Sequence, residues 1–316
     1  MPGRFLAARS FYALSLLLGV TLLTFSLMVW FGPDQTYELI GRNSTPEQIA
    51  ELRAELGYDR PFWSRYGHWL MELASGNLGL SNRSGESVSA LLQRALPVTA
   101  ALVLPGFLLG NLLGLAAGLW AAWRRDSLWD RLILGASVTG LSLSFLVIII
   151  ALQLLLCTPY GLNWFPARGW RMDSLGTYLL HVTVPTLALL LVTLGYNTRF
   201  YRAVAAEELQ RDHVRTALAY GATPLGLLGG PVLRNCLVPV ITRVLYSIPL
   251  VLVSGSLLLE TYFGIPGIGR VTFDAISSGD QPVLLAIVTL TAALFVVVQL
   301  LAEFACRLAD PRGRLP

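Results

Sequence analysis

The segment Arg211-Asp212-His213-Val214-Arg215-Thr216-Ala217-Leu218-Ala219-Tyr220-Gly221 is a polar, arginine-bearing stretch between two long apolar runs, and Asn235 and Pro239 follow it. This pattern predicts a short helix that lies outside a bilayer and ends at Gly221, before the chain returns into the membrane at Pro239. A segment of this kind is shaped to be gripped by another protein from outside the membrane.

The composition is that of a polytopic membrane protein. Of 316 residues, 54% are hydrophobic and 13% are charged, and the mean hydropathy is +0.62. The net charge of +4 comes from 23 arginines, with no lysine, and these form no basic stripe of the kind that binds nucleic acid. Cys157, Cys236 and Cys306 are far apart, so the sequence predicts neither a disulfide framework nor a metal site.

Six apolar windows of about 20 residues, the length that crosses a hydrocarbon core, can be placed along the chain. We expect membrane spans at residues 11–31, 97–123, 132–157, 179–197, 238–263 and 283–306. The first run is too long for a cleaved signal and no small-residue cleavage site follows it, so we expect it to persist as a helix. The predicted fold class is therefore all-α, with six transmembrane helices.

The arginines predict the orientation. If the N-terminus is cytoplasmic, 13 of the 23 arginines lie inside, namely Arg4, Arg9, Arg124, Arg125, Arg131, Arg199, Arg202, Arg211, Arg215, Arg234, Arg307, Arg312 and Arg314. The long segment after the first helix is charge-balanced, with six arginines and eight acidic residues. The positive-inside rule therefore favours cytoplasmic N- and C-termini.

The expected organisation is an N-terminus and first helix at 1–31, an external insertion at 32–96, and a membrane core at 97–316. Within the insertion, Thr45 followed by Pro46 predicts a helix start. The aromatic residues that follow are expected to lie flat at the membrane interface, with substrate binding as the alternative; they are Phe62, Trp63, Tyr66 and Trp69.

Four glycines at a spacing of four residues mark the second span: Gly106, Gly110, Gly114 and Gly118. Such a stripe lets another backbone approach closely, either from this chain or from a second membrane subunit. The intramembrane polar residues are too dispersed to predict a catalytic pair; they are Asn111, Gln153, His181, Asn197, Arg243, Gln299 and Glu303. Arg243 has two interpretations, a snorkelling side chain or a charge that faces a transport pathway.

Several short motifs occur in a characteristic order: Gly19–Phe25, Leu56–Pro61, Gly76–Gly79, Val214–Ala217 with Gly221, Leu233–Asn235 to Pro239, Glu260 with Phe263, Pro266–Gly269 and Asp310–Arg312. Together they make nearly the whole chain resemble the B-type permease subunits of dipeptide, oligopeptide and nickel ABC importers. The resemblance implies a type I ABC importer permease bundle in the bacterial inner membrane.

The resemblance also implies site residues. A cytoplasmic coupling loop at 199–237 would contact an ATPase, through Arg215, Thr216, Ala217, Gly221, Arg234, Asn235 and Pro239. Candidates for the pathway or its gate are Arg243, Glu260, Gln299 and Glu303. Tyr220 stands where the family usually has lysine, and the stretch after it is unusually rich in glycine and proline, which can reshape the ATPase contact.

The implied function is a permease subunit that forms half of a translocation pathway for di- or oligopeptides, with nickel, opines or sugars as alternatives. The implied partners are a homologous second permease, one or two ATPase subunits that bind ATP and Mg, and an external substrate-binding protein. This chain cannot contain a phosphate-binding loop, because it has no lysine. It is therefore expected to be a transport subunit without a cofactor of its own.

Two other classes remain as alternatives. A membrane-embedded enzyme would need a clustered nucleophile and base or a metal motif, and the sequence offers neither. An ATP-independent carrier would be expected to contain an inverted repeat, which this sequence does not suggest.

Overall fold

The computed structural model describes residues 2–32, 45–55 and 59–309. The Asp310–Arg312 motif and residues 56–58 of the Leu56–Pro61 motif lie outside the described residues. The described part is built from helices, with one isolated β-bridge between Leu80 and Ser87. The expectation of an all-α chain is therefore confirmed.

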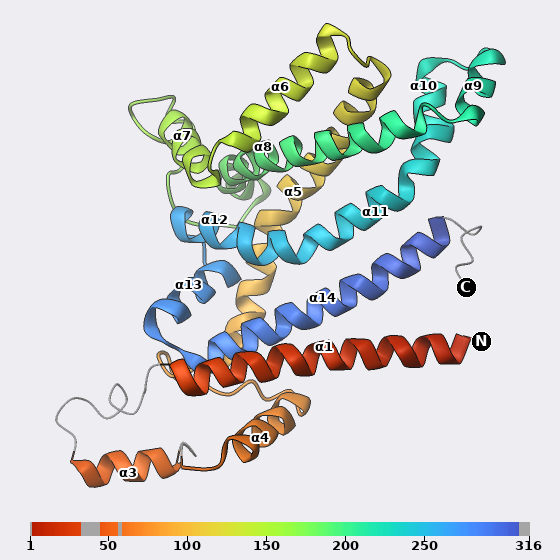
Figure 1. Cartoon of the computed structure of the whole chain (residues 1–316). Coiled ribbons are helices and arrows are strands. Elements are labelled where there is room, and N and C mark those ends of the chain that lie inside the picture. Colours follow the sequence, from red (N-terminus) through yellow and green to blue (C-terminus); the bar gives the residue numbers. More distant parts are fainter. Residues whose placement is uncertain (1, 33–44, 56–58, 310–316) are drawn as a thin grey trace. The chain divides into compact units, whose positions relative to one another are not determined.

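The helices follow one another along the chain as Figure 1 shows. They are α1 (Pro2–Phe31), α3 (Pro46–Glu55), α4 (Phe62–Ala74), α5 (Val88–Trp123), α6 (Leu128–Ser142), α7 (Phe145–Cys157), α8 (Leu175–Glu208), α9 (Asp212–Ala219), α10 (Pro224–Leu227), η1 (Leu228–Val232), α11 (Leu233–Leu250), η2 (Val251–Gly255), α12 (Ser256–Phe263), α13 (Ile268–Ser278) and α14 (Gln281–Ala309).

Five helical stretches in the described residues are long and apolar enough to cross a membrane: 11–31, 88–123, 175–208, 224–263 and 281–309. The pair α6 and α7 makes a sixth if both helices belong to one span. Each of these stretches contains one of the predicted windows or most of it, so the sequence located the spans correctly. The helices extend beyond the apolar windows because hydrogen bonding continues where hydropathy ends.

The third predicted span, at residues 132–157, is not one continuous helix. α6 and α7 are bent by 98° at a short break. Leu143 and Ser144, in the break, both have extended backbone angles, with ψ of 134° and 138°. No proline marks this position, so the bend comes from two residues that leave the helical region of φ/ψ space.

Pro239, the predicted point of membrane re-entry, is not the residue at which the helix begins. α11 begins at Leu233, and Pro239 lies inside it. The glycine- and proline-rich stretch before it is itself helical, because Thr223 caps α10 by accepting from Gly226 N–H at 3.2 Å and Pro224 occupies the first turn. Gly230 then breaks the regular geometry of η1 with φ −101° and ψ −106°.

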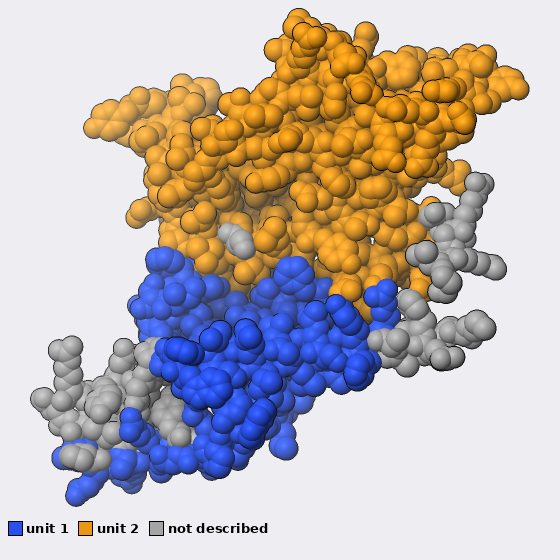
Figure 2. Space-filling model, in the orientation of Figure 1, with its two compact units in different colours: residues 1–97, 270–296 blue, residues 98–269, 297–316 orange. Residues whose placement is uncertain are grey.

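The chain divides into two compact units, which Figure 2 distinguishes by colour. One unit comprises residues 1–97 and 270–296, and the other comprises residues 98–269 and 297–316.

In the first unit, the predicted start of α3 is confirmed. The backbone N–H of Thr45 donates to Gln48 Oε1 at 3.1 Å, and the N–H of Gln48 donates to Thr45 Oγ1 at 3.4 Å. This reciprocal pair is a capping box.

Most of the predicted aromatic cluster packs within the first unit. Phe62, Tyr66 and Trp69 of α4 surround Phe25 of α1, with ring centroids 5.4 to 5.7 Å away. The Tyr66 hydroxyl lies 3.0 Å from Thr21 Oγ1, which satisfies both buried hydroxyls. The aromatic side chains thus hold α4 against α1.

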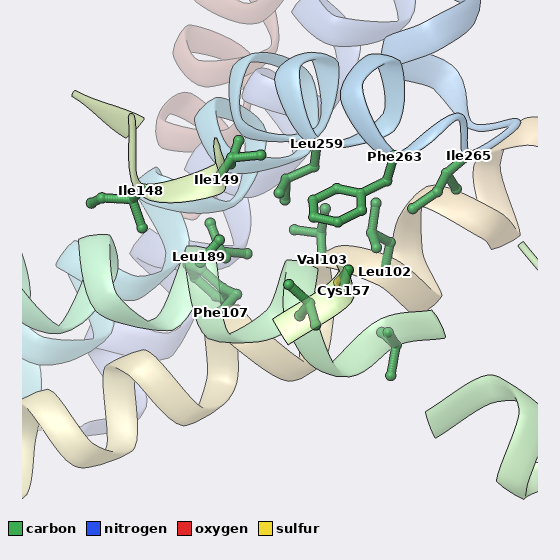
Figure 3. Packing of buried hydrophobic residues seen from close by; sticks show 13 residues of the cluster. Leu102, Val103, Phe107, Ile148, Ile149, Cys157, Leu189, Leu259, Phe263 and Ile265 are labelled. Atoms are coloured by element: carbon green, nitrogen blue, oxygen red, sulfur yellow. The ribbon is translucent and has the colours of Figure 1, made fainter. Parts of the chain in front are cut away.

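In the second unit, a hydrophobic core joins α5, α7, α8 and α12. Figure 3 shows Phe263 of α12 pointing toward Val103 and Leu102 of α5, with Cys157 of α7 close by. Phe263 is buried, and its van der Waals packing is the kind of contact that holds helices together in a membrane. This core fixes α12 against the membrane-spanning helices.

The glycine stripe of α5 lies against α8 of the same chain. A methyl group added at Gly106 would lie 3.0 Å from the Thr186 carbonyl oxygen, and one at Gly114 would lie 2.8 Å from Asn197 Cβ. A methyl group at Gly110 would overlap Thr193, and one at Gly118 would lie 2.9 Å from Arg202 N. The absence of these side chains lets the two helices pack backbone to backbone, which favours the intrachain interpretation of the stripe.

Candidate functional site

The helix α9 ends in the geometry that the sequence predicts. Gly221 has φ +81°, in the left-handed region that favours glycine. Its N–H donates to the Leu218 carbonyl at 2.9 Å, and the N–H of Ala222 donates to the Ala217 carbonyl at 3.1 Å. These two bonds form a Schellman motif, which stops the helix and turns the chain sharply.

One face of α9 is anchored and the other is exposed. Val214 is 1% exposed and packs with Leu227 and Val232, which the glycine- and proline-rich stretch supplies. The next residue, Arg215, is exposed, and its only ionic contact in the described chain is a 3.7 Å pair with Asp212. Tyr220 at the helix end is 89% exposed. The helix therefore presents polar and aromatic groups outward from a fixed base.

The position of α9 is fixed by Glu208, which no sequence motif marks. Its side chain is 5% exposed, and its carboxylate lies 2.9 Å from Arg211 Nε and 3.1 Å from His213 Nε2. Asn235 of α11 donates to the same carboxylate at 2.6 Å. One buried carboxylate thus joins the end of α8, the start of α9 and the start of α11. Figure 1 labels these three helices.

Two signals in the sequence pointed toward this anchor. Arg211 follows Glu208 by three residues, a spacing at which opposite charges meet on a helix. Asn235 belongs to a motif in the sequence, and in the structure its side chain donates a hydrogen bond to Glu208. The sequence could not show that these residues converge, because 27 residues separate Glu208 from Asn235.

A buried ion pair lies on the same unit. Arg202 of α8 donates two hydrogen bonds to Asp130 of α6, each of 2.6 Å. Asp130 also accepts from the backbone N–H of Asp126 at 3.0 Å. From the sequence, Arg202 is expected only to lie on the cytoplasmic side, whereas in the structure it clamps the α5–α6 connection to α8.

Two of the intramembrane polar residues that the sequence analysis judged dispersed lie together. Asn197 Nδ2 donates to Asn111 Oδ1 at 3.0 Å, and the Tyr201 hydroxyl donates to the same oxygen at 2.8 Å. Asn111 in turn donates to the Phe107 carbonyl at 2.9 Å. This network stands beside the glycine stripe, where the close approach of α5 and α8 brings short polar side chains within reach.

The four pathway candidates do not form one cluster. Glu260 is fully buried and accepts a 2.6 Å hydrogen bond from Thr99, which also accepts from the Ile268 N–H at 2.8 Å. Gly267 packs directly on the Glu260 carboxylate, which leaves no room for a side chain there. Glu260 thereby links α12, α5 and the start of α13.

Arg243 lies 17 residues before Glu260, a separation of roughly 25 Å along a helix. The guanidinium carbon of Arg243 is 5.5 Å from the Phe200 ring centroid, and its Nε is buried without a hydrogen-bond partner. Gln299 and Glu303 of α14 are half-buried and occupy one helical turn.

The comparisons with known proteins cover nearly the whole chain. Residues 114–315 match the family described as the binding-protein-dependent transport system inner membrane component. Residues 3–103 match the N-terminal part of binding-protein-dependent transport system membrane components.

The chain is also similar to individual permeases. It is 34% identical over 305 residues to a Brucella abortus (strain 2308) protein named as a peptide transport system permease, with 96% of each chain covered. It is 33% identical to a di/tripeptide transport system permease protein of Pseudomonas aeruginosa (strain UCBPP-PA14), with 98% of each chain covered. It is 32% identical to a dipeptide transport system permease protein of Lactococcus lactis subsp. cremoris (strain MG1363), with 96% of each chain covered.

Proposed function

Because the chain belongs to the binding-protein-dependent transport system inner membrane components, as a B-type permease of the peptide ABC importer family, we propose that it imports di- or oligopeptides. In this proposal it forms half of the translocation pathway and pairs with a homologous permease. The relatives named for peptide transport support the substrate class.

The remaining components follow from this assignment. One or two ATPase subunits bind ATP and Mg on the cytoplasmic side, and a soluble binding protein delivers the peptide from outside. The N- and C-termini are cytoplasmic, residues 32–96 are an external insertion, and residues 97–316 form the core that contains the coupling loop at 199–237. Arginine placement supports this orientation.

The observation that carries the proposal is the construction of α9. Its outer face, with Arg215 and Tyr220, is available to a partner, while Val214 and the Glu208 anchor hold its base. A rigid helix on a fixed base can transmit a displacement of the ATPase to α8 and α11, because packed elements move as units. Thr216, Ala217 and Gly221 complete this coupling helix.

The pathway candidates receive different roles. We assign Arg243 to the pathway, since a cation on a membrane-spanning helix without an anionic partner in the described chain is costly unless water or another molecule stabilises it. Gln299 and Glu303 are further candidates on α14. Glu260 supports the α12–α13 junction instead, because its carboxylate is engaged by Thr99 and enclosed.

Cross-linking tests the proposed docking of α9. In a background without Cys157, Cys236 and Cys306, a cysteine at Tyr220 should cross-link to the ATPase subunit of the same transporter in native membranes. A cysteine at Asp59 is the matched control and should yield no ATPase product. Equal products from both positions, or none from Tyr220→Cys in an active transporter, would refute the docking.

A further inference from the structure

A groove of about 960 Å³ lies beside the base of α9, within the second unit. Arg211, His213 and Arg234 contribute to its polar lining, while Leu233, Leu237 and Val238 contribute apolar surface. It is far larger than a bound ion requires, and it lies within the size range of sites for small organic ligands.

The charge of the groove is positive. Among the described residues that line it, none is acidic. The guanidinium of Arg211 already forms ion pairs with the carboxylates of Glu208, at 2.9 Å, and Glu207, at 3.8 Å. Arg234 is exposed and forms no hydrogen bond or ion pair through its side chain with the part of the chain that is described. The groove therefore offers a guanidinium with free donors to an anion.

The apolar part of the lining continues into the membrane span. Leu237 and Val238 follow Arg234 by about one helical turn on α11, which belongs to the apolar stretch 224–263. A ligand that fits both parts carries an anionic group at one end and hydrocarbon at the other. Basic pockets at the ends of membrane helices bind anionic lipid headgroups for this reason.

We propose that this groove binds an anionic phospholipid, whose phosphate contacts Arg234 and Arg211 and whose acyl chain lies along Leu237 and Val238. The guanidinium of Arg234 suits a phosphate because its planar fork donates two parallel hydrogen bonds. This inference requires that the chain spans a membrane, and it is independent of any coupling to an ATPase. Arg234 then has a ligand of its own beside the coupling helix.

The test is native mass spectrometry of the full chain, delipidated in detergent and titrated with phosphatidylglycerol. Phosphatidylcholine of the same chain length is the charge control, and glycerol phosphate alone tests whether the hydrocarbon contributes. Arg234→Gln should weaken phosphatidylglycerol binding about tenfold, the loss expected for one charged hydrogen-bonded contact. Arg234→Lys keeps the charge but not the fork, so its binding should lie between that of the unchanged protein and that of Arg234→Gln.

Arg215→Gln is the matched control, because Arg215 is an exposed arginine on the same segment that does not line the groove. It should bind phosphatidylglycerol as the unchanged protein does. Equal loss in Arg215→Gln and Arg234→Gln, or equal binding of both lipids, would overturn the proposal. A third result would also overturn the proposal: the ATPase subunit displaces the lipid, and Arg234→Gln weakens ATPase binding. The groove would then belong to the ATPase.

Discussion

The side-chain nitrogen of Asn235, at the start of α11, lies 2.6 Å from Oε1 of Glu208, at the end of α8. The same carboxylate meets Arg211 and His213, which flank the start of α9. A single buried acceptor therefore determines how the proposed coupling helix is attached to two long helices.

Glu208→Ala should uncouple transport from ATP hydrolysis. Removing the carboxylate leaves Asn235 and Arg211 without their acceptor, at a cost of about 1–3 kcal/mol concentrated at the base of α9. Peptide uptake by the reconstituted transporter should fall about tenfold, while basal ATP hydrolysis persists.

Glu207→Ala is the matched control for this change. Glu207 is the preceding residue, its side chain is 79% exposed, and its contact with Arg211 is a 3.8 Å surface pair. Surface pairs of this kind contribute at most about 1 kcal/mol. Peptide uptake should stay close to that of the unchanged protein. An equal loss of uptake in both variants would show that Glu208 does not anchor α9 in the way proposed.

Gly114→Ala should destabilise the protein by separating α5 from α8. The added methyl group would lie 2.8 Å from Asn197 Cβ, and overpacking of this kind costs about 1–3 kcal/mol. The midpoint of thermal unfolding in detergent should fall. Gly135→Ala, in α6, meets no atom within 4 Å and should leave the midpoint unchanged or raise it slightly, because alanine favours the helix. An unchanged midpoint for Gly114→Ala would mean that the helices are not pressed together there.

The orientation predicts which side of the membrane each segment faces. In a background without the native cysteines, Asp59→Cys should react with a membrane-impermeant thiol reagent in intact cells. Asp212→Cys and Arg312→Cys should react only after the membrane is permeabilised. Labelling of Asp212→Cys from outside would reverse the proposed topology.

Arg243 predicts a dependence on the charge of the transported peptide. If its guanidinium receives the carboxylate of the substrate, Arg243→Gln should slow uptake of peptides with free C-termini more than that of peptides with amidated C-termini. Arg243→Lys keeps the charge but not the planar fork of the guanidinium. Its uptake of peptides with free C-termini should lie between that of the unchanged protein and that of Arg243→Gln. If Arg243→Gln transports both peptides as the unchanged protein does, at equal protein levels, Arg243 only anchors the helix at the interface.

The sequence predicted the parts of the fold that depend on local chemistry. Apolar length located the spans, Thr45 and Gln48 formed the expected cap, and Gly221 adopted the positive φ that ends α9. It missed the bend at Leu143 because no glycine or proline marks it. It did not predict that the helix of the fifth span begins before its apolar window, because helix formation overrode the glycines and prolines before Leu233.

The convergence of distant residues was the part that sequence reasoning could not reach. Asn111 and Asn197 are 86 residues apart and share a hydrogen bond, and Asp130 and Arg202 are 72 apart and form an ion pair. A hydropathy profile treats each residue separately, so each of these four residues looks like an isolated polar group. Only the packing of α5 and α6 against α8 turns them into pairs.

The central claim is that α9, ended by Gly221, couples this permease to ATP hydrolysis. Its most direct test is peptide-stimulated ATP hydrolysis by the reconstituted transporter carrying Gly221→Val or Gly221→Asn. Valine at φ +81° is strained by roughly 1–2 kcal/mol or more, whereas asparagine tolerates this region. We predict that the valine variant inserts and assembles normally but loses the stimulation, and that the asparagine variant retains it. Full stimulation in the valine variant would contradict the account.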